Sequence, residues 1–221
     1  MTSSKRLTFL ITSGPTKEYL DPVRFISNDS SGKMGAALAE AALKKHHNVI
    51  FVTGCASINP PKAARVVNVV SANEMFSAVK KNFKKADVII GAAAVADFAP
   101  AVFSKNKIKK SGKLPVIKLK KNPDIIAYCG KNKKNQIVVS FALETEKLLE
   151  NAALKLKNKN TDFIVANSKT SICADKSSAH IIFANGLKIN LKKSDKKIIA
   201  GKIINETIGL FESIKTRKKN S

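Results

Sequence analysis

The run Arg24-Phe25-Ile26-Ser27-Asn28-Asp29-Ser30-Ser31-Gly32-Lys33-Met34-Gly35 lies between an apolar segment, Leu7–Thr12, and a helical segment, Ala36–Lys45. A strand, a loop rich in hydroxyl groups and a helix start form an arrangement that binds phosphate. The first main-chain N–H groups of a helix lack internal partners, and the helix dipole is positive at that end. Lys33 adds a positive charge to the loop. A polar turn with an ordinary helix cap is the competing interpretation, but the number of donors favours phosphate binding.

The spacing of the glycines excludes two common phosphate-binding motifs. Ser27 stands where the Walker pattern requires its first glycine, and Met34 stands where it requires serine or threonine. Gly32 and Gly35 supply only the second half of the dinucleotide fingerprint. An NAD-dependent reductase is disfavoured further because the second expected strand ends at Thr53 and not at an acidic residue.

Composition indicates a globular cytoplasmic protein. The chain has 221 residues, of which 44% are hydrophobic, and no apolar stretch approaches the roughly 20 residues of a membrane helix. The first residues lack the apolar core of a secretory signal, so we expect neither export nor a membrane partner. Three widely spaced cysteines, Cys55, Cys129 and Cys173, are typical of reduced thiols rather than of disulfides or a metal site.

The formal charge of +24 raises the hypothesis of nucleic-acid binding. Only Arg6, Arg24, Arg65 and Arg217 among the forty cations are arginine, and the chain has two tyrosines and no tryptophan. Base reading favours arginine, and single-strand binding favours aromatic platforms. We therefore expect solvated lysine faces and no specific nucleic-acid partner. A basic Rossmann-like nucleotide- or RNA-binding protein without catalysis remains the alternative function.

Apolar strands alternate with amphipathic helices along the whole chain, which predicts one α/β domain over residues 1–221. Such strands, apolar nearly throughout, indicate a Rossmann-like, mostly parallel sheet with helices on both faces and ligand sites at the carboxyl ends of the strands. The expected strands are Leu7–Thr12, Val49–Thr53, Arg65–Val70, Asp87–Ala94, Leu114–Leu119, Ile137–Phe141 and Asp162–Ala166. Two of the expected helices are Ala36–His46 and Glu144–Lys157. A third is capped by Ser71 and runs to about Lys84, and a fourth has Pro123 in its first turn and runs to about Gly130. The last helix is expected to run from Ser194 or Asp195 to about Ile214.

Three segments depart from this alternation. Residues from about 103 to 113 are basic and polar and predict a mobile flap. Ile181–Phe183 and Leu187–Leu191 flank Asn185-Gly186 and predict a small β-hairpin excursion. Residues from about 215 to 221 are expected to form a disordered, dispensable tail.

Polar residues follow several of the expected strands. Asp97 comes after the Ala92–Ala96 segment, Glu144 follows the sixth strand and Asn167 closes the seventh. Each could be a simple turn or cap residue. Because the carboxyl ends of parallel strands meet at one edge, their joint placement favours a site, and small residues such as Ala92 and Ala93 allow a ligand to approach the main chain.

Six segments, in this order, resemble the signatures of the phosphopantothenate–cysteine ligase (phosphopantothenoylcysteine synthetase) family. They span nearly the whole chain, and the second and third together are highly specific. The resemblance is to the stand-alone bacterial form, since the chain has no room for the flavin-dependent decarboxylase fused to many members. The segments are Thr12–Glu18, Asp21–Gly35, Ala92–Phe98, Lys107–Lys110, Lys121–Ile125 and Val165–Asn167.

The resemblance implies a ligase of coenzyme A biosynthesis that joins L-cysteine to 4′-phosphopantothenate. It implies CTP as co-substrate, an acyl-cytidylate intermediate, release of pyrophosphate and CMP, assistance by Mg²⁺, and a homodimer to which the 181–191 hairpin contributes. Metal ligands are not identified, and ATP remains an alternative to CTP.

The same resemblance assigns roles by motif position. It gives Asn28 and Lys107 as catalytic, with Asn28 holding the acyl group and Lys107 on the flap that folds over the site. Substrate contacts are Asn28, Ala92, Ala93 and Asp97. Nucleotide contacts are Gly14, Ser30, Gly32, Gly35, Asp97, Lys107, Pro123, Asp124, Ile125, Ile126, Phe141, Lys155, Lys159 and Asn167.

Overall fold

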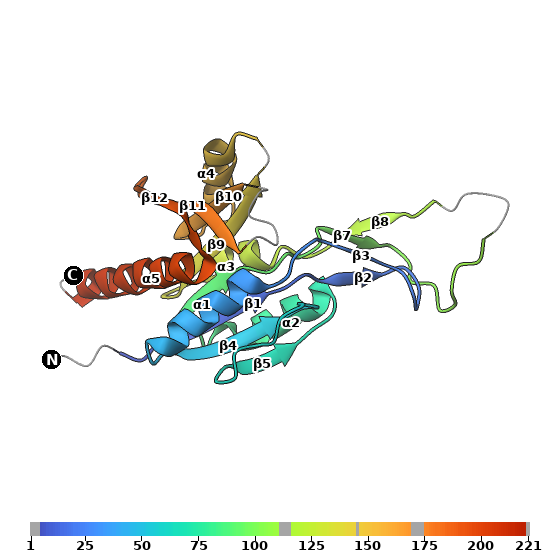
Figure 1. Ribbon diagram of the computed structural model, residues 1–221, viewed down its shortest axis with the longest axis horizontal. Coiled ribbons are helices and arrows are strands. Elements are labelled where there is room, and N and C mark those ends of the chain that lie inside the picture. The colour runs from blue at the N-terminus through green and yellow to red at the C-terminus, as the bar shows by residue number, and fades with distance from the viewer. Residues whose placement is uncertain (1–4, 111–115, 145, 169–174, 220–221) are drawn as a thin grey trace.

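An eight-stranded sheet with helices on both faces forms the body of the protein in the computed structural model, which describes residues 5–110, 116–144, 146–168 and 175–219 (Figure 1). The strand order is β12-β11-β10-β9-β6-β1-β4-β5. The first six sheet strands in chain order are parallel, and the β11–β12 hairpin adds two antiparallel strands at one edge. This confirms the predicted fold class. The strands are β1 (Thr8–Ser13), β4 (Asn48–Thr53), β5 (Arg65–Asn68), β6 (Val88–Gly91), β9 (Ile137–Glu144), β10 (Phe163–Ser168), β11 (Lys176–Phe183) and β12 (Lys188–Asp195).

Two helices pack on one face of the sheet and three on the other. Side chains alternate along β1, so that Phe9 and Ile11 lie in the core under α1 and α5 while Leu10 lies in the core under α2 and α3. All three are fully buried, and burying such a side chain contributes about 1.5–3 kcal/mol. The helix α4 packs over β9 and β10 on the same face as α2 and α3. The helices are α1 (Lys33–Lys44), α2 (Ala72–Phe83), α3 (Ile125–Asn132), α4 (Leu148–Asn158) and α5 (Lys196–Lys219).

Local hydrogen bonds explain where the helices begin. The Ser71 side chain accepts from the Glu74 N–H at 3.2 Å, and the Glu74 carboxylate accepts from the Val70 N–H at 2.9 Å, so the predicted start of α2 is confirmed. The start predicted for α3 at Pro123 is wrong, because Asp124 is the N-cap and accepts from the Ala127 N–H at 2.9 Å.

A β-arm projects from the body beside the carboxyl ends of the central strands (Figure 1). It contains two antiparallel pairs of short strands, β2 (Lys17–Tyr19) with β3 (Phe25–Ser27) and β7 (Phe98–Pro100) with β8 (Leu119–Lys121). The sequence did not predict this arm. The strand expected at Leu114–Leu119 is wrong for the described residues 116–118, because pairing with β7 begins only at Leu119; residues 111–115 lie outside the described part of the chain.

Two further boundaries differ from the prediction. The helix α4 begins at Leu148, since Glu144 still belongs to β9 and pairs with Ser168. The helix α5 continues through Lys219, where a disordered tail was expected from residue 215. None of the helices in the described part of the chain combines the length and the apolar character needed to cross a membrane.

Candidate active site

Gly32, at the end of the loop between β3 and α1, and Gly14, directly after β1, both pack closely against Ala56. Gly32 is the N-cap of α1 with φ of 79°, and its carbonyl accepts from the Ser13 hydroxyl at 3.1 Å. A Cβ added to Gly32 would lie 2.8 Å from the Ala56 Cβ, and one added to Gly14 (φ of 72°) would lie 2.9 Å from the same atom. Both positions therefore require glycine, for space as well as for the left-handed backbone.

Two hydroxyl groups of the loop accept from main-chain N–H groups at the start of α1. The Gly32 N–H donates to the Ser30 hydroxyl and the Lys33 N–H donates to the Ser31 hydroxyl, each at 3.4 Å. These distances exceed the usual range of about 2.7–3.2 Å for such bonds. A phosphate oxygen could therefore displace the hydroxyl groups and gain from the positive end of the helix dipole.

The turn after β6 faces this loop and is tied to it by Asn28. The Asn28 side-chain amide donates to the carbonyl oxygens of Val95 at 3.0 Å and Ala94 at 3.4 Å. The Ala94 N–H in turn donates to the Gly14 carbonyl at 3.0 Å. Three segments that are far apart in the sequence thus meet at the carboxyl end of the sheet.

A cavity of about 200 Å³ opens between these segments and the ends of β9 and β10. Asn167 at the end of β10 has a buried Oδ1 atom with no hydrogen-bond partner within the described part of the chain, so the cavity contains an acceptor for a ligand N–H or O–H group. Six predicted site residues line the cavity, namely Ser30, Gly32, Ala92, Ala93, Phe141 and Asn167. The other lining residues are Asp29, Ser31, Lys33, Met34, Ala94, Ala142, Leu143 and Lys196.

The predicted nucleotide-binding lysines on α4 and at its C-cap form ion pairs. The Lys155 ammonium lies 2.7 Å from the Glu144 carboxylate, and the Lys159 ammonium lies 3.0 Å from the Asp124 carboxylate. The pairs connect α4 to the end of β9 and to the start of α3. A triphosphate that used both lysines would have to replace these carboxylates as their partners.

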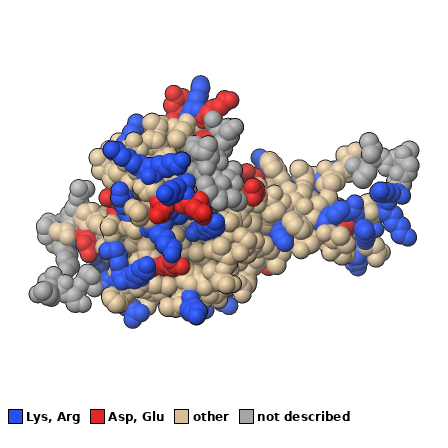
Figure 2. Space-filling view, viewed as in Figure 1, with Lys and Arg blue, Asp and Glu red and all other residues tan. Residues whose placement is uncertain are grey.

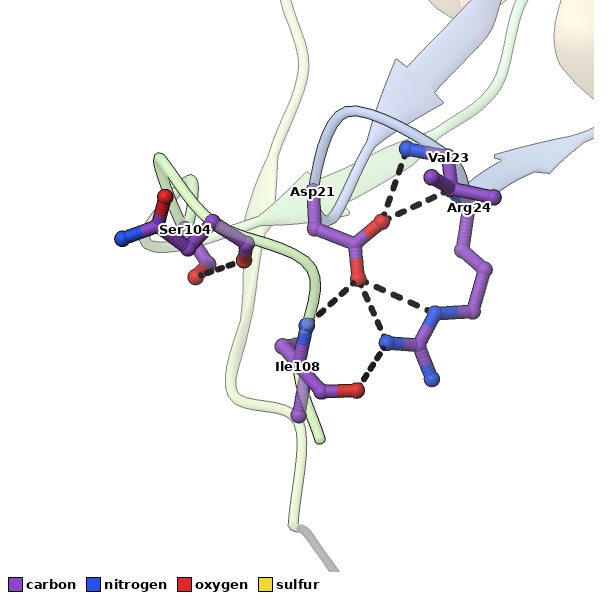
Figure 3. A network of polar contacts seen from close by, with 6 residues as sticks. Asp21, Val23, Arg24, Ser104 and Ile108 are labelled. Atoms are coloured by element: carbon purple, nitrogen blue, oxygen red, sulfur yellow. Dashed lines mark hydrogen bonds and ion pairs between the residues drawn. The ribbon is translucent and has the colours of Figure 1, made fainter. Parts of the chain in front are cut away.

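Lys107 and Asp97 are exposed and do not line the cavity. Asp97 ends the turn at the base of the arm, where its carbonyl accepts from the Asn122 N–H at 2.9 Å. Lys107 lies on the arm beside Ile108, whose main chain contacts the turn between β2 and β3 (Figure 3). This conformation therefore does not bring Lys107 to the cavity of its own chain.

Two lysines in the lining were not among the predicted site residues. Lys33 forms an ion pair with Asp175 at 2.7 Å, and the hydrogen bond and the charge of Lys33 lower the pKa of that carboxyl. Its place in the phosphate loop was a sequence signal that pointed to it. Lys196 begins α5 and carries no motif, so only the fold brings it to the cavity.

The positive charge is not gathered in a single patch on the face shown in Figure 2. Lysines and arginines are spread over the body and the arm, with acidic residues among them on the body, on the face shown in Figure 2. A larger cavity of about 500 Å³ lies at the opposite, amino edge of the sheet, between residues preceding β1, β6 and β9 and the end of α5, and contains none of the predicted site residues.

Residues 4–210 match the family described as the DNA/pantothenate metabolism flavoprotein C-terminal domain. The chain belongs to this family. It is 41% identical over 210 residues to the coenzyme A biosynthesis bifunctional protein CoaBC of Haemophilus influenzae, and 40% identical over 206 residues to that of Bacillus subtilis. The alignments cover 93% and 91% of the chain but 52% and 51% of the relatives, so the chain spans about half the length of these curated relatives.

Several solved structures share the fold of this chain. The C-terminal domain of a CoaBC protein, solved as a crystal structure, is 36% identical to this chain. The superposition has a TM-score of 0.84 and covers 96% of this chain and 100% of that chain. The DNA/pantothenate metabolism flavoprotein from Streptococcus pneumoniae is 24% identical, with a TM-score of 0.80 over 93% of this chain and 99% of that chain. A Cab2 mutant in complex with phosphopantothenate-cysteine is 20% identical, with a TM-score of 0.81 over 96% of this chain and 89% of that chain.

Proposed function

We propose that the protein is a phosphopantothenate–cysteine ligase that uses CTP and acts in the cytoplasm. The observation that carries this proposal is the 200 Å³ cavity at the start of α1, in a chain of the DNA/pantothenate metabolism flavoprotein C-terminal family. The cavity combines a phosphate-binding helix start with the small side chains of Ala92 and Ala93 and the unsatisfied acceptor of Asn167. It thus offers both an anion site and access to the main chain.

The reaction has two steps. A carboxylate oxygen of 4′-phosphopantothenate bonds to the α-phosphorus of CTP as the bond to pyrophosphate breaks, which gives the acyl-cytidylate. The cysteine amine then bonds to the acyl carbon as CMP leaves. Both steps gather negative charge, so donors fixed in advance lower the barrier. The α1 N–H groups and Lys33 supply such donors to phosphate, and Asn28 fixes the turn against which the acyl group lies.

The donor set fits Mg²⁺ that arrives with CTP. The described residues contain no group of three or more His, Cys, Asp or Glu that would hold a metal by itself. Mg²⁺ needs only one or two carboxylates in addition to substrate phosphates. Asp29 in the cavity lining is the candidate ligand. The bound ion would neutralise charge on the phosphates.

A homodimer joined through the arms is part of this proposal. The arm exposes a set of large apolar side chains, whereas the 181–191 hairpin exposes mainly Leu187; apolar surface of this kind favours an interface on the arm. In such a dimer, the arm of one copy would also bring its Lys107 to the active site of the other copy. Mixing the impaired Asn28→Asp and Lys107→Gln variants would raise activity above that of either variant alone if sites are shared between copies. The exposed apolar residues of the arm include Tyr19, Val23, Phe25, Phe98, Phe103 and Leu119.

The deciding experiment incubates the protein with 4′-phosphopantothenate, L-cysteine, Mg²⁺ and CTP, and measures pyrophosphate and CMP. Release of both, dependent on cysteine, supports the proposal, and ATP in place of CTP tests nucleotide selectivity. Release of CDP and inorganic phosphate would indicate an acyl phosphate and contradict the cytidylate mechanism. RNA binding that survives physiological salt, without nucleotide consumption, would favour the non-catalytic alternative, because non-specific phosphate attraction falls steeply with salt.

A further inference from the structure

A buried carboxylate organises the turn between β2 and β3 in the arm. The Asp21 side chain is completely buried. Its Oδ1 atom accepts from the main-chain N–H groups of Val23 and Arg24, both at 2.9 Å. Its Oδ2 atom accepts from the Arg24 Nε and Nη2 atoms at 3.0 and 2.6 Å, and from the Ile108 N–H at 3.1 Å (Figure 3).

Ile108 is held through both of its main-chain polar groups. Its N–H donates to Asp21, and its carbonyl accepts from the Arg24 Nη2 atom at 2.6 Å. A second tie lies four residues earlier, where the Ser104 N–H donates to the Leu20 carbonyl at 2.8 Å. The segment that carries Lys107 is thus fixed to the β2–β3 turn on both sides of that residue.

The two oxygens of Asp21 serve different purposes. The bonds to Oδ1 form a local turn that asparagine could also form. Of the three bonds to Oδ2, two hold the Arg24 guanidinium and one reaches the main chain of Ile108, 87 residues away, and all three need an acceptor. Burying the Asp21 carboxylate is costly in desolvation, and an ion pair with the half-exposed Arg24 adds little net stability, so the presence of the carboxylate is better explained by the geometry that it imposes.

The carboxylate remains charged throughout the neutral range. Burial alone would raise the pKa of Asp21, but the hydrogen bonds from Val23, Arg24 and Ile108 outweigh burial and hold that pKa well below its usual value. The arrangement therefore persists under the conditions in which the enzyme works.

We propose that Asp21 and Arg24 are positioning residues that fix the main chain at Ile108 and thereby set where the ammonium group of Lys107 is presented to the reacting acyl nucleotide. The inference rests on the proposed function, in which Lys107 acts at the active site. It assigns to two arm residues a role that needs no contact with substrate.

The test compares Asp21→Asn with wild type and with a matched control. Asparagine keeps the turn acceptor but removes the Oδ2 acceptor, so we expect kcat to fall by about 100-fold, the cost of a misplaced group, with KM for CTP little changed. Faster hydrogen–deuterium exchange of the Ile108 amide should accompany this loss. Asp87→Asn is the control, because Asp87 also accepts a main-chain N–H (Thr8, 2.9 Å) and a lysine (Lys5, 2.9 Å), but at the opposite edge of the sheet. Its kcat should be unchanged.

Lys107→Gln separates positioning from a general structural role. If Asp21 acts through Lys107, the double variant Asp21→Asn/Lys107→Gln should be no slower than Lys107→Gln alone. Multiplied losses in the double variant would overturn the inference, as would a normal kcat in Asp21→Asn despite faster exchange at Ile108. A wild-type protein without ligase activity would instead contradict the proposed function.

Arg24→Lys tests the same inference if Asp21→Asn fails to fold. Lysine keeps the charge but cannot bond Asp21 and the Ile108 carbonyl as a fork. A reduced kcat with a normal KM for phosphopantothenate supports positioning. A normal kcat with a raised KM would mean that Arg24 binds substrate directly, and would overturn its positioning role.

Discussion

Replacing Gly35 by alanine is expected to destabilise the protein although alanine is the better helix former. A Cβ at this position would lie 2.4 Å from the Ser13 Oγ atom, 2.5 Å from its Cβ and 3.1 Å from its Cα. The helix gains about 1 kcal/mol from alanine, but overpacking against a strand costs about 2–3 kcal/mol, which leaves a net loss of about 1–2 kcal/mol. Rotation of Ser13 cannot relieve the contact, because its Cβ is itself too close.

Urea unfolding followed by circular dichroism measures this loss, with Gly209→Ala as the matched control. Gly209 also lies within a helix, α5, but a Cβ added there would meet no neighbouring group within 4 Å, so alanine should stabilise by about 0.5–1 kcal/mol. The two substitutions are chemically identical and should shift the midpoint in opposite directions with similar slopes.

Adding Ser13→Gly to the Gly35→Ala variant tests whether the close contact with Ser13 causes the loss of stability. It removes the two closest atoms, so the double variant should recover most of the loss and show a coupling of about 1–2 kcal/mol. Strictly additive effects, or a Gly35→Ala protein as stable as Gly209→Ala, would show that the close approach of α1 to β1 does not constrain this position.

Three further predictions concern activity, pH and thiol chemistry. Asn28→Asp should lower turnover about 100- to 1000-fold in steady-state assays, with little change in the free energy of unfolding. The reason is that it places a negative charge beside two carbonyl oxygens and a developing anion. Near-normal turnover would remove Asn28 from the mechanism. Burial and the charges of Lys45 and Arg6 lower the pKa of His47, whose Nδ1 atom accepts from the Leu7 N–H. The free energy of unfolding should therefore fall as pH drops below about 6.5, the pKa of histidine in the unfolded chain. His47→Gln should flatten this pH dependence in denaturation curves. Burial raises the pKa of Cys129 to about 12, so mass spectrometry after brief iodoacetamide treatment at pH 8 should find Cys55 modified and Cys129 intact in the native protein.

The body of the fold was predictable because its signals are local. The apolar run at β1, the capping residues Ser71 and Glu74 and the Asn-Gly turn before β12 each fix an element within a few residues. The arm was not predictable on this basis, since β2, β3, β7 and β8 have three residues each and exist through pairing with one another. Three residues contain too little periodicity to distinguish a strand from a loop.

The same distinction separates the site residues. Loop residues such as Gly32 were identified from chemistry and spacing, and the approach of Asn28 to Val95 agrees with one shared sheet edge. The contact of Lys33 with Asp175 joins residues 142 positions apart and depends on how α1 and β11 are placed. Likewise, the sequence put Lys155 on a triphosphate without indicating that Glu144 would hold it in this conformation.

The β11–β12 hairpin at the edge of the sheet affects whether copies of this protein aggregate at high concentration. An edge strand presents unpaired main-chain groups on which a strand of another molecule can add, and lysine is the residue that most often blocks such addition. The strand β12 ends the sheet with exposed Lys188, Lys192 and Lys193, and a formal charge of +24 makes copies repel one another. The basic composition thus protects against aggregation at this edge, and replacing Lys192 and Lys193 by threonine should convert a protected edge into a template for self-association.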